Sequence, residues 1–91
     1  MTQETRQILF TGRVQGVGFR WATNRIAQNH PINGFVRNLP DGRVELVCQG
    51  EPDDIDGLLS DVKEHFAQNI TNVAQVPSAD IQSFSTFEIR S

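Results

Sequence analysis

The sequence GRVQGVGFRW, residues 12–21, carries three glycines within seven residues and then, two residues after the last of them, an arginine. Before it, residues 7–14 place Ile8 and Phe10 on one face at the period-two spacing of a strand. After it, apolar residues recur every three or four positions over residues 19–29, as on one face of a helix. The stretch therefore predicts a strand, a glycine-rich loop and a helix in direct succession.

Two further strands follow, over residues 32–39 and 43–49. The Pro40-Asp41-Gly42 sequence between them favours a hairpin turn, because proline presets one turn position and glycine tolerates positive φ. In the second of these strands Val44, Leu46 and Cys48 alternate with polar residues. This hairpin is the second unit of the predicted fold.

A second helix has one apolar stripe at i, i+3, i+4, i+7 and i+11, made of Ile55, Leu58, Leu59, Val62 and Phe66. Pro52 suits its first turn, and residues 70–76 and 84–90 are typical of strands. The element order is β-α-β-β-α-β with a short final strand. We therefore expect an α+β, ferredoxin-like sandwich over residues 1–91, a single domain with two helices on one face of a mostly antiparallel sheet.

Length and composition suit a small globular protein, with 91 residues, of which 37% are hydrophobic. The lone cysteine, Cys48, excludes an internal disulfide and suits a reducing compartment. The apolar run 8–10 is too short for a signal peptide, and no stretch approaches a membrane span. We therefore expect a complete, cytoplasmic chain without membrane contact. Its small core favours a monomer.

Charge is unevenly distributed along the chain. The net charge of −3 argues against general nucleic-acid binding. Residues 1–45, however, hold six arginines against three acids, whereas residues 46–91 hold two basic residues against eight acids. The positive half contains the glycine loop, which makes an anion site there electrostatically reasonable.

The glycine loop has the features of such a site. A helix N-terminus offers unpaired N–H groups and the positive end of the helix dipole. Gly16 and Gly18 allow positive φ and close approach of the backbone to a ligand. Arg20 falls in the first helical turn, where the dipole disfavours a cation by roughly 0.3–1 kcal/mol unless an anion lies between them.

The common phosphate motifs do not fit this loop. A Walker loop from Gly12 requires glycine at position 17, which is Val17. A dinucleotide fingerprint from Gly16 requires glycine at position 21, which is Trp21. On spacing alone, a glycine-rich turn beside an exposed arginine remains an equal alternative.

Two segments resemble the signatures of a known family. GRVQGVGFR, residues 12–20, resembles the first signature of the acylphosphatase family, and GFVRNLPDGRVELVCQG, residues 34–50, resembles the second. The likeness runs from the first strand through Phe66, weakens, and returns in the terminal FEIR.

The resemblance implies hydrolysis of the carboxyl–phosphate bond of a small-molecule acyl phosphate, without a metal or organic cofactor. Carried onto this chain, it makes Arg20 the catalytic arginine and Asn38 the residue that positions the attacking water. It also implies that backbone N–H groups hold the phosphate, supplied by Gln15, Gly16, Val17, Gly18 and Phe19. The alternative is a non-enzymatic module that binds phosphate or a phosphorylated ligand with the same loop, including one like the acylphosphatase-like part of carbamoyl-phosphate-handling maturation proteins.

The chain departs from the family pattern in three places. Phe10 replaces an aliphatic residue, which is a conservative packing change. The sequence AQNITNV, residues 67–73, replaces a glycine-proline pair and leaves that loop open. Trp21 lies about 200° around the helix from Phe19, which leaves both ordinary packing and contact with the acyl group as interpretations.

The remaining candidates favour structural roles. Asn38 without the resemblance is a turn former before Pro40, and Arg13 and Arg37 are expected to be merely exposed. The aspartates at 53, 54 and 56 suit the first turn of a helix rather than a calcium loop. Surface or helix-end roles are expected for the two histidines, His30 and His65.

Overall fold

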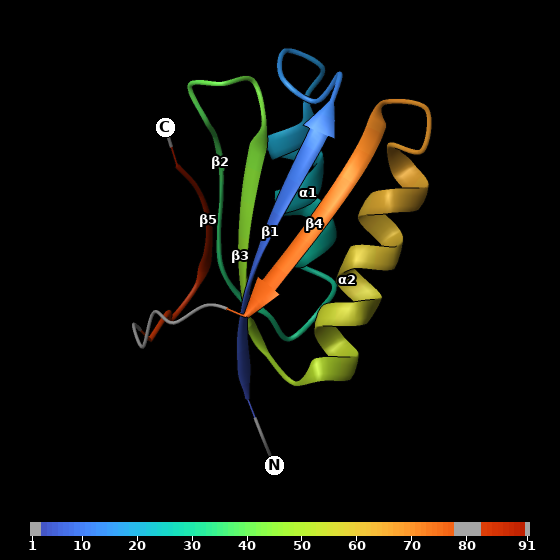
Figure 1. Ribbon diagram of the computed structural model, residues 1–91. Helices are drawn as coiled ribbons and strands as arrows, with labels where there is room; N and C mark the ends of the chain where they lie inside the picture. Colours follow the sequence, from blue (N-terminus) through green and yellow to red (C-terminus); the bar gives the residue numbers. More distant parts are fainter. Residues whose placement is uncertain (1–2, 78–82, 91) are drawn as a thin grey trace.

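The computed structural model of the chain describes residues 3–77 and 83–90, and its elements follow the predicted order (Figure 1). The strands are β1 (Glu4–Gly12), β2 (Asn33–Asn38), β3 (Val44–Gly50), β4 (Ile70–Pro77) and β5 (Phe87–Arg90), and the helices are α1 (Phe19–Ala27) and α2 (Pro52–His65). Of the domain predicted over residues 1–91, positions 1–2, 78–82 and 91 lie outside the described residues.

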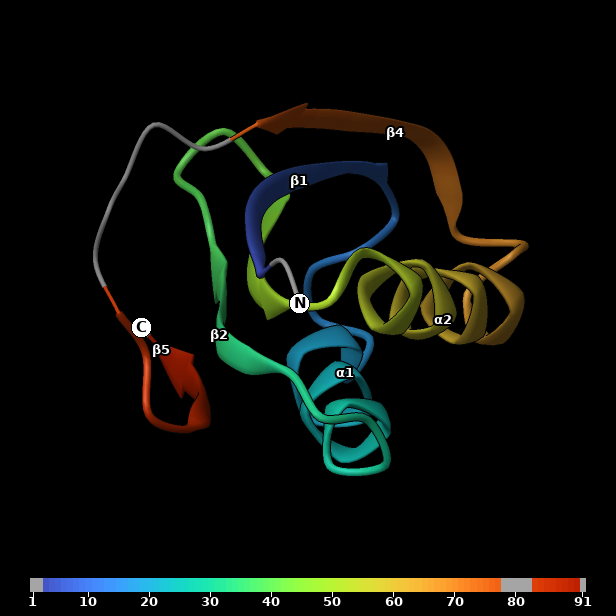
Figure 2. The ribbon, with the colours of Figure 1, turned by 90° about the horizontal axis from the view of Figure 1, so that it is seen from below.

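The five strands form one sheet in the order β4-β1-β3-β2-β5. β5 runs parallel to β2, and the other three neighbouring pairs are antiparallel. Both helices cover the same face of the curved sheet (Figures 1 and 2). The predicted α+β, ferredoxin-like architecture is confirmed. Neither helix in the described part of the chain is long and apolar enough to cross a membrane.

The core fills the layer between the sheet and the two helices, and the apolar stripe predicted for α2 is buried in it. Three phenylalanine rings in contact connect the sheet with α1 and with the end of α2. The ring of Phe19, at the start of α1, lies 5.0 Å from that of Phe10 in β1 and 4.4 Å from that of Phe66 after α2, centroid to centroid. Removing a buried phenylalanine ring costs about 3–5 kcal/mol, so these contacts fix where α1 begins.

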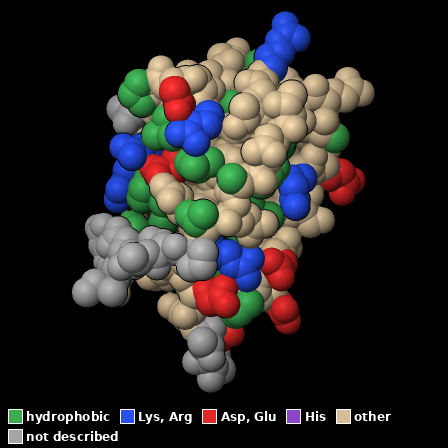
Figure 3. All heavy atoms as spheres, viewed as in Figure 1, with side chains coloured by type: hydrophobic (Ala, Val, Ile, Leu, Met, Phe, Trp, Pro, Cys, Tyr) green, Lys and Arg blue, Asp and Glu red, His purple; other side chains and the backbone are tan. Residues whose placement is uncertain are grey.

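The opposite face of the sheet carries no helix, and Figure 3 shows hydrophobic, acidic and basic side chains mixed on it. Arg37 was expected to be merely exposed, but its Nε lies 2.5 Å from Oε1 of Glu45 in an ion pair. Glu45 is buried and also accepts a hydrogen bond from Gln7. Arg37 therefore compensates a buried carboxylate, a pairing between strands that the sequence alone did not predict.

Two predicted strand ends are corrected. β1 ends at Gly12 rather than at residue 14, because the backbone N–H of Arg13 leaves the ladder and donates to the carbonyl of Asn69 at 2.8 Å. The Asn69 side chain donates in return to the Arg13 carbonyl at 3.1 Å. Segment 67–73, for which the sequence predicted no loop conformation, thus ties the glycine loop to the start of β4. The last strand begins at Phe87 rather than Phe84, whose ring packs against Phe35 instead.

The burial of the Cys48 thiol allows a direct test of the core packing. Cys48 lies fully buried in β3, and burial raises the pKa of its thiol to about 12, only partly opposed by the charge of Arg6. Because the thiolate is the reactive form, iodoacetamide at pH 8 is expected to modify Cys48 only as fast as the fold opens. Mass spectrometry with and without urea measures this. Rapid modification of the native protein would contradict the burial of Cys48.

Candidate active site

The loop between β1 and α1 is shaped by two glycines in left-handed conformation. Gly16 has φ 76° and Gly18 has φ 79°. A Cβ atom added to either would meet no atom within 4 Å, so the backbone conformation, and not lack of space, requires glycine. Any other residue there would cost roughly 1–2 kcal/mol. Space beside both glycines is therefore open to a ligand.

Most backbone N–H groups of this loop have no hydrogen-bond partner among the described residues. From residue 15 to residue 21, no backbone N–H donates a hydrogen bond to any described part of the chain; the first to do so is that of Ala22, to the Gly18 carbonyl at 3.0 Å. Gly18 is the N-cap of α1 and supplies no side-chain cap, and the first turn contains no acidic residue. The start of α1 is thus an uncompensated positive dipole end, which attracts an anion.

Arg20 adds a full positive charge at the same place. It is half-buried, and its Nη1 donates to the backbone carbonyl of Arg90 in β5 at 3.2 Å. No acidic side chain among the described residues forms an ion pair with it. β5 therefore holds one side of the guanidinium while its remaining donors stay available for an anion.

Asn38 comes from a different element, the last position of β2, and is half-buried. Its side chain has no hydrogen-bond partner within residues 3–77 and 83–90. The amide of Gln15 donates to the carbonyls of Leu39 at 2.8 Å and Arg43 at 2.9 Å. Gln15 thereby fastens the glycine loop to the hairpin that carries Asn38. Sequence reasoning missed this side-chain role, which no local pattern signals.

These groups meet in a pocket of about 230 Å³, lined by Val14, Gly16, Gly18, Phe19, Arg20, Trp21, Asn38 and Ile89. The pocket is small beside typical ligand sites of about 300–1,000 Å³, which suits a phosphate group and part of a small substituent. Arg20 and Asn38 are brought together as expected. Of the five expected loop residues, Gln15 and Val17 do not line the pocket.

Three lining residues were not assigned from the sequence as site residues. Val14 and Ile89 were missed, because the former follows the buried pattern of β1 and the latter lies 69 positions from Arg20 in the chain. Trp21 does not pack in the core, since it is 61% exposed, and it also lines the pocket.

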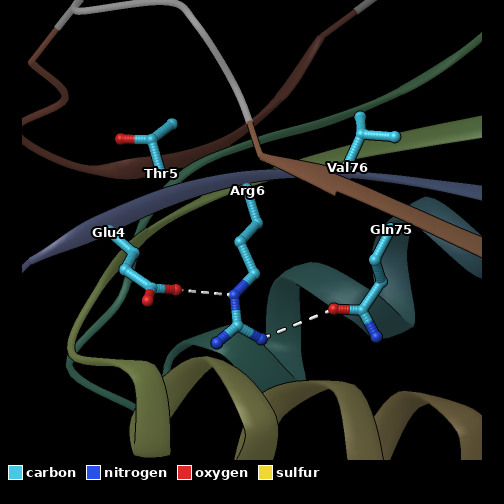
Figure 4. Close-up of a pocket in the computed structure, with 5 residues that line it drawn as sticks. All are labelled: Glu4, Thr5, Arg6, Gln75 and Val76. Atoms are coloured by element: carbon cyan, nitrogen blue, oxygen red, sulfur yellow. Dashed lines mark hydrogen bonds and ion pairs between the residues drawn. The ribbon is translucent and has the colours of Figure 1, made fainter.

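A larger hollow, about 400 Å³, lies elsewhere, between β1 and β4 (Figure 4). Its cation, Arg6, already pairs with Glu4 and Asp56, each at 2.8 Å, and contacts Gln75. The hydrogen bonds to Asp56 and Glu4 raise the pKa of Arg6 further. Because this arginine is neutralised, the hollow is a weaker anion site than the one at Arg20.

The other titratable candidates take structural positions. His30, after α1, contacts Asp61 of α2 at 2.8 Å, and the ring of His65 packs edge-on against Phe66. Asp53 and Asp54 lie in the first turn of α2. Within the described residues, no three His, Cys, Asp or Glu side chains gather in a way that could hold a metal ion.

Comparison with known proteins gives a consistent result. The family model for acylphosphatase matches residues 6–89. An acylphosphatase of Archaeoglobus fulgidus is 41% identical over 83 residues, which cover 91% of this chain and 93% of the relative.

Two solved structures share the whole fold. The crystal structure of acylphosphatase from Bacillus subtilis has a TM-score of 0.85 at 27% identity and covers 99% of this chain and 100% of its own. An acylphosphatase from Coxiella burnetii has a TM-score of 0.84 at 32% identity and covers 97% and 93% respectively. Since the family match includes both the glycine loop and β2, the chain belongs to the acylphosphatase family.

Proposed function

We propose that this chain hydrolyses the carboxyl–phosphate anhydride bond of acyl phosphates, releasing a carboxylate and inorganic phosphate. The observation that carries the proposal is the meeting of Arg20, Asn38 and the unpaired loop N–H groups at one small pocket in a member of the acylphosphatase family. The pocket offers one full positive charge, a set of fixed dipoles and one neutral amide.

The phosphate end of the substrate binds at the glycine loop. Loop N–H groups and the free donors of Arg20 surround the non-bridging phosphoryl oxygens, where negative charge resides in the transition state. Gly16 and Gly18 line the pocket with backbone alone, so the phosphate can approach the N–H groups closely. Since the donors are fixed before the substrate arrives, little reorganisation is needed during the reaction.

The amide of Asn38 positions the attacking water. Its side chain lines the pocket and has no partner among the described residues, so it is available to orient a water in line with the scissile bond. The water oxygen bonds to phosphorus as the bond from phosphorus to the acyl oxygen breaks. The proton of the water passes to a phosphate oxygen.

Hydrolysis of an acyl phosphate in this way requires neither a general acid nor a cofactor. The leaving group is a carboxylate, whose conjugate acid has a pKa of about 4 by analogy with side-chain carboxyls. Such a group departs without being protonated. Arg20 and the loop dipoles supply the positive charge that a metal ion provides in other phosphoryl-transfer sites.

We also propose that the chain works as one monomeric, cytoplasmic domain over residues 1–91, with a small-molecule substrate and without nucleic acid or membrane as partner. The net charge of −3 supports the absence of a nucleic-acid partner. Cys48 is a free, buried thiol, which suits a reducing compartment. The described exposed hydrophobic residues are few, which supports a monomer.

Arg20→Gln and Asn38→Ala test the two assigned roles with benzoyl phosphate in a chelator such as EDTA. Loss of a preorganised charge donor lowers turnover by about 10²–10³-fold, so Arg20→Gln is expected to lose both turnover and inhibition by inorganic phosphate. Asn38→Ala is expected to lose kcat to a similar degree while phosphate inhibits it nearly as well as before. Steady-state kinetics with phosphate as inhibitor separate the two.

The matched control is Arg13→Gln, which removes the same charge from an exposed position outside the pocket. It is expected to stay within about threefold of the wild type, because exposed charges are screened by solvent. Full activity in both site variants would show that the residues are wrongly assigned. Saturable phosphate binding by a wild type without turnover would assign the site to a binding module.

Gln15→Ala tests whether the loop must be fastened to the β2–β3 hairpin. The variant loses two hydrogen bonds, each worth about 1 kcal/mol, and frees the loop to shift relative to Asn38. Displacements near 1 Å can cost about 10²-fold in rate, so we expect kcat to fall about tenfold or more. Gln7→Ala, which loses a hydrogen bond to Glu45 on the opposite face, is the control. Equal kcat in the two variants, at similar thermal stability, would argue against the positioning role of Gln15.

A further inference from the structure

Most of the large exposed hydrophobic side chains of the described residues lie at or beside the proposed phosphate site. Four large ones are exposed, namely Val17, Trp21, Val76 and Ile89. Trp21 and Ile89 line the pocket, and Val17 belongs to the glycine loop. Single exposed hydrophobics are ordinary, but two that line one pocket, with a third in the adjoining loop, place an apolar surface beside an anion site.

Trp21 is the most exposed of them, at 61%, and stands between two hollows. It lines the phosphate pocket and also a second hollow of about 500 Å³ that includes Arg25. Arg25 lies one helical turn further along α1, with its guanidinium carbon 5.0 Å from the centre of the indole. Arg25 lines only the second hollow, so it supports the ring from that side.

The guanidinium of Arg25 has no acidic partner among the described residues and contacts the indole of Trp21 instead. A cation over an indole face is a favourable contact, and it restricts the orientation of an otherwise exposed side chain. Ile89, from β5, supplies an aliphatic surface on the same pocket. The pocket therefore combines the polar groups of Arg20, Asn38 and the glycine loop with an apolar side at Trp21 and Ile89.

An acyl phosphate has the same division, with a charged phosphate at one end and an acyl group at the other. We propose that Trp21 and Ile89 form an acyl-group subsite that favours acyl phosphates with a flat, apolar acyl group, such as an aromatic one, over those with a short acyl group. Arg25 is a positioning residue that holds the indole. The inference rests on the proposed function, because that function places the phosphate at Arg20 and so directs the acyl group toward Trp21 and Ile89.

The kinetic test compares benzoyl phosphate with acetyl phosphate, which share the phosphate and differ in the acyl group. Trp21→Ala is expected to lower the ratio of kcat/KM for benzoyl to acetyl phosphate by about three- to tenfold, as the loss of one aromatic contact predicts. The change is expected mainly in KM for benzoyl phosphate. Trp21→Phe, which keeps a flat ring, is expected to retain most of the ratio.

Val76→Ala is the matched control, because it removes an exposed apolar side chain outside the pocket. Its ratio is expected to equal that of the wild type. Arg25→Met, which keeps the length of the side chain without its charge, is expected to raise KM for benzoyl phosphate and leave kcat unchanged. An unchanged ratio in Trp21→Ala would overturn the subsite. A wild type that prefers succinyl phosphate, with a preference that Arg25→Met abolishes, would also overturn the subsite. That result would show that the surface beside Trp21 binds acyl groups with a second negative charge.

A binding measurement keeps this inference separate from the proposed function. Trp21 is the one tryptophan of the chain, so the protein's fluorescence reports the residue assigned to the subsite. Benzoylphosphonate and acetylphosphonate carry a phosphorus–carbon bond that the proposed reaction does not cleave. The subsite predicts at least threefold tighter binding of benzoylphosphonate, in competition with inorganic phosphate. If neither acyl phosphate is hydrolysed but this difference remains, the proposed hydrolysis fails and the subsite stands; equal affinities overturn the subsite.

Discussion

The backbone turn at Gly16 and Gly18 is the constraint on which the site depends. It brings the chain into α1 with positive φ at both glycines, and the N–H groups from residue 15 to residue 21 find no acceptor in the described part of the chain. A buried or half-buried helix start without partners is unfavourable in isolation. The first turn of α1 has no side-chain cap and no acidic residue, and it carries Arg20. An anion bound there would compensate both the positive dipole end and the arginine.

The fold stabilises this turn from three directions. Phe19 anchors the first residue of α1 in the core, between Phe10 and Phe66. Gln15 ties the loop to the hairpin after β2, and Asn69 ties its beginning to β4. β5 reaches Arg20 through the carbonyl of Arg90. The energetic cost of the open anion site is thus offset by burial and hydrogen bonds at its edges, a common arrangement at functional sites.

The sequence predicted the parts of this arrangement that local patterns encode. Apolar periodicity predicted the element order and the buried stripe of α2. The resemblance to the two signatures selected Arg20 and Asn38, which both line the pocket. Contacts between distant segments were beyond it. Ile89 reaches the pocket through the pairing of β5 with β2, and the buried carboxylate of Glu45 is paired with Arg37 and Gln7 from neighbouring strands. For Trp21 the sequence left ordinary packing and contact with the acyl group open, because spacing on a helix does not show what the helix faces.

An NMR titration of the ¹⁵N-labelled protein with inorganic phosphate tests the central claim most directly, because it observes each backbone N–H separately. The account predicts saturable shifts of the amide signals from residues 15 to 21, together with the side-chain signals of Arg20, while amides around Arg6 stay unchanged. Hydrogen bonding to phosphate is expected to move the loop amide protons downfield. Unchanged loop amides at saturating phosphate, or shifts centred on another surface, would contradict the assignment of the glycine loop as the anion site.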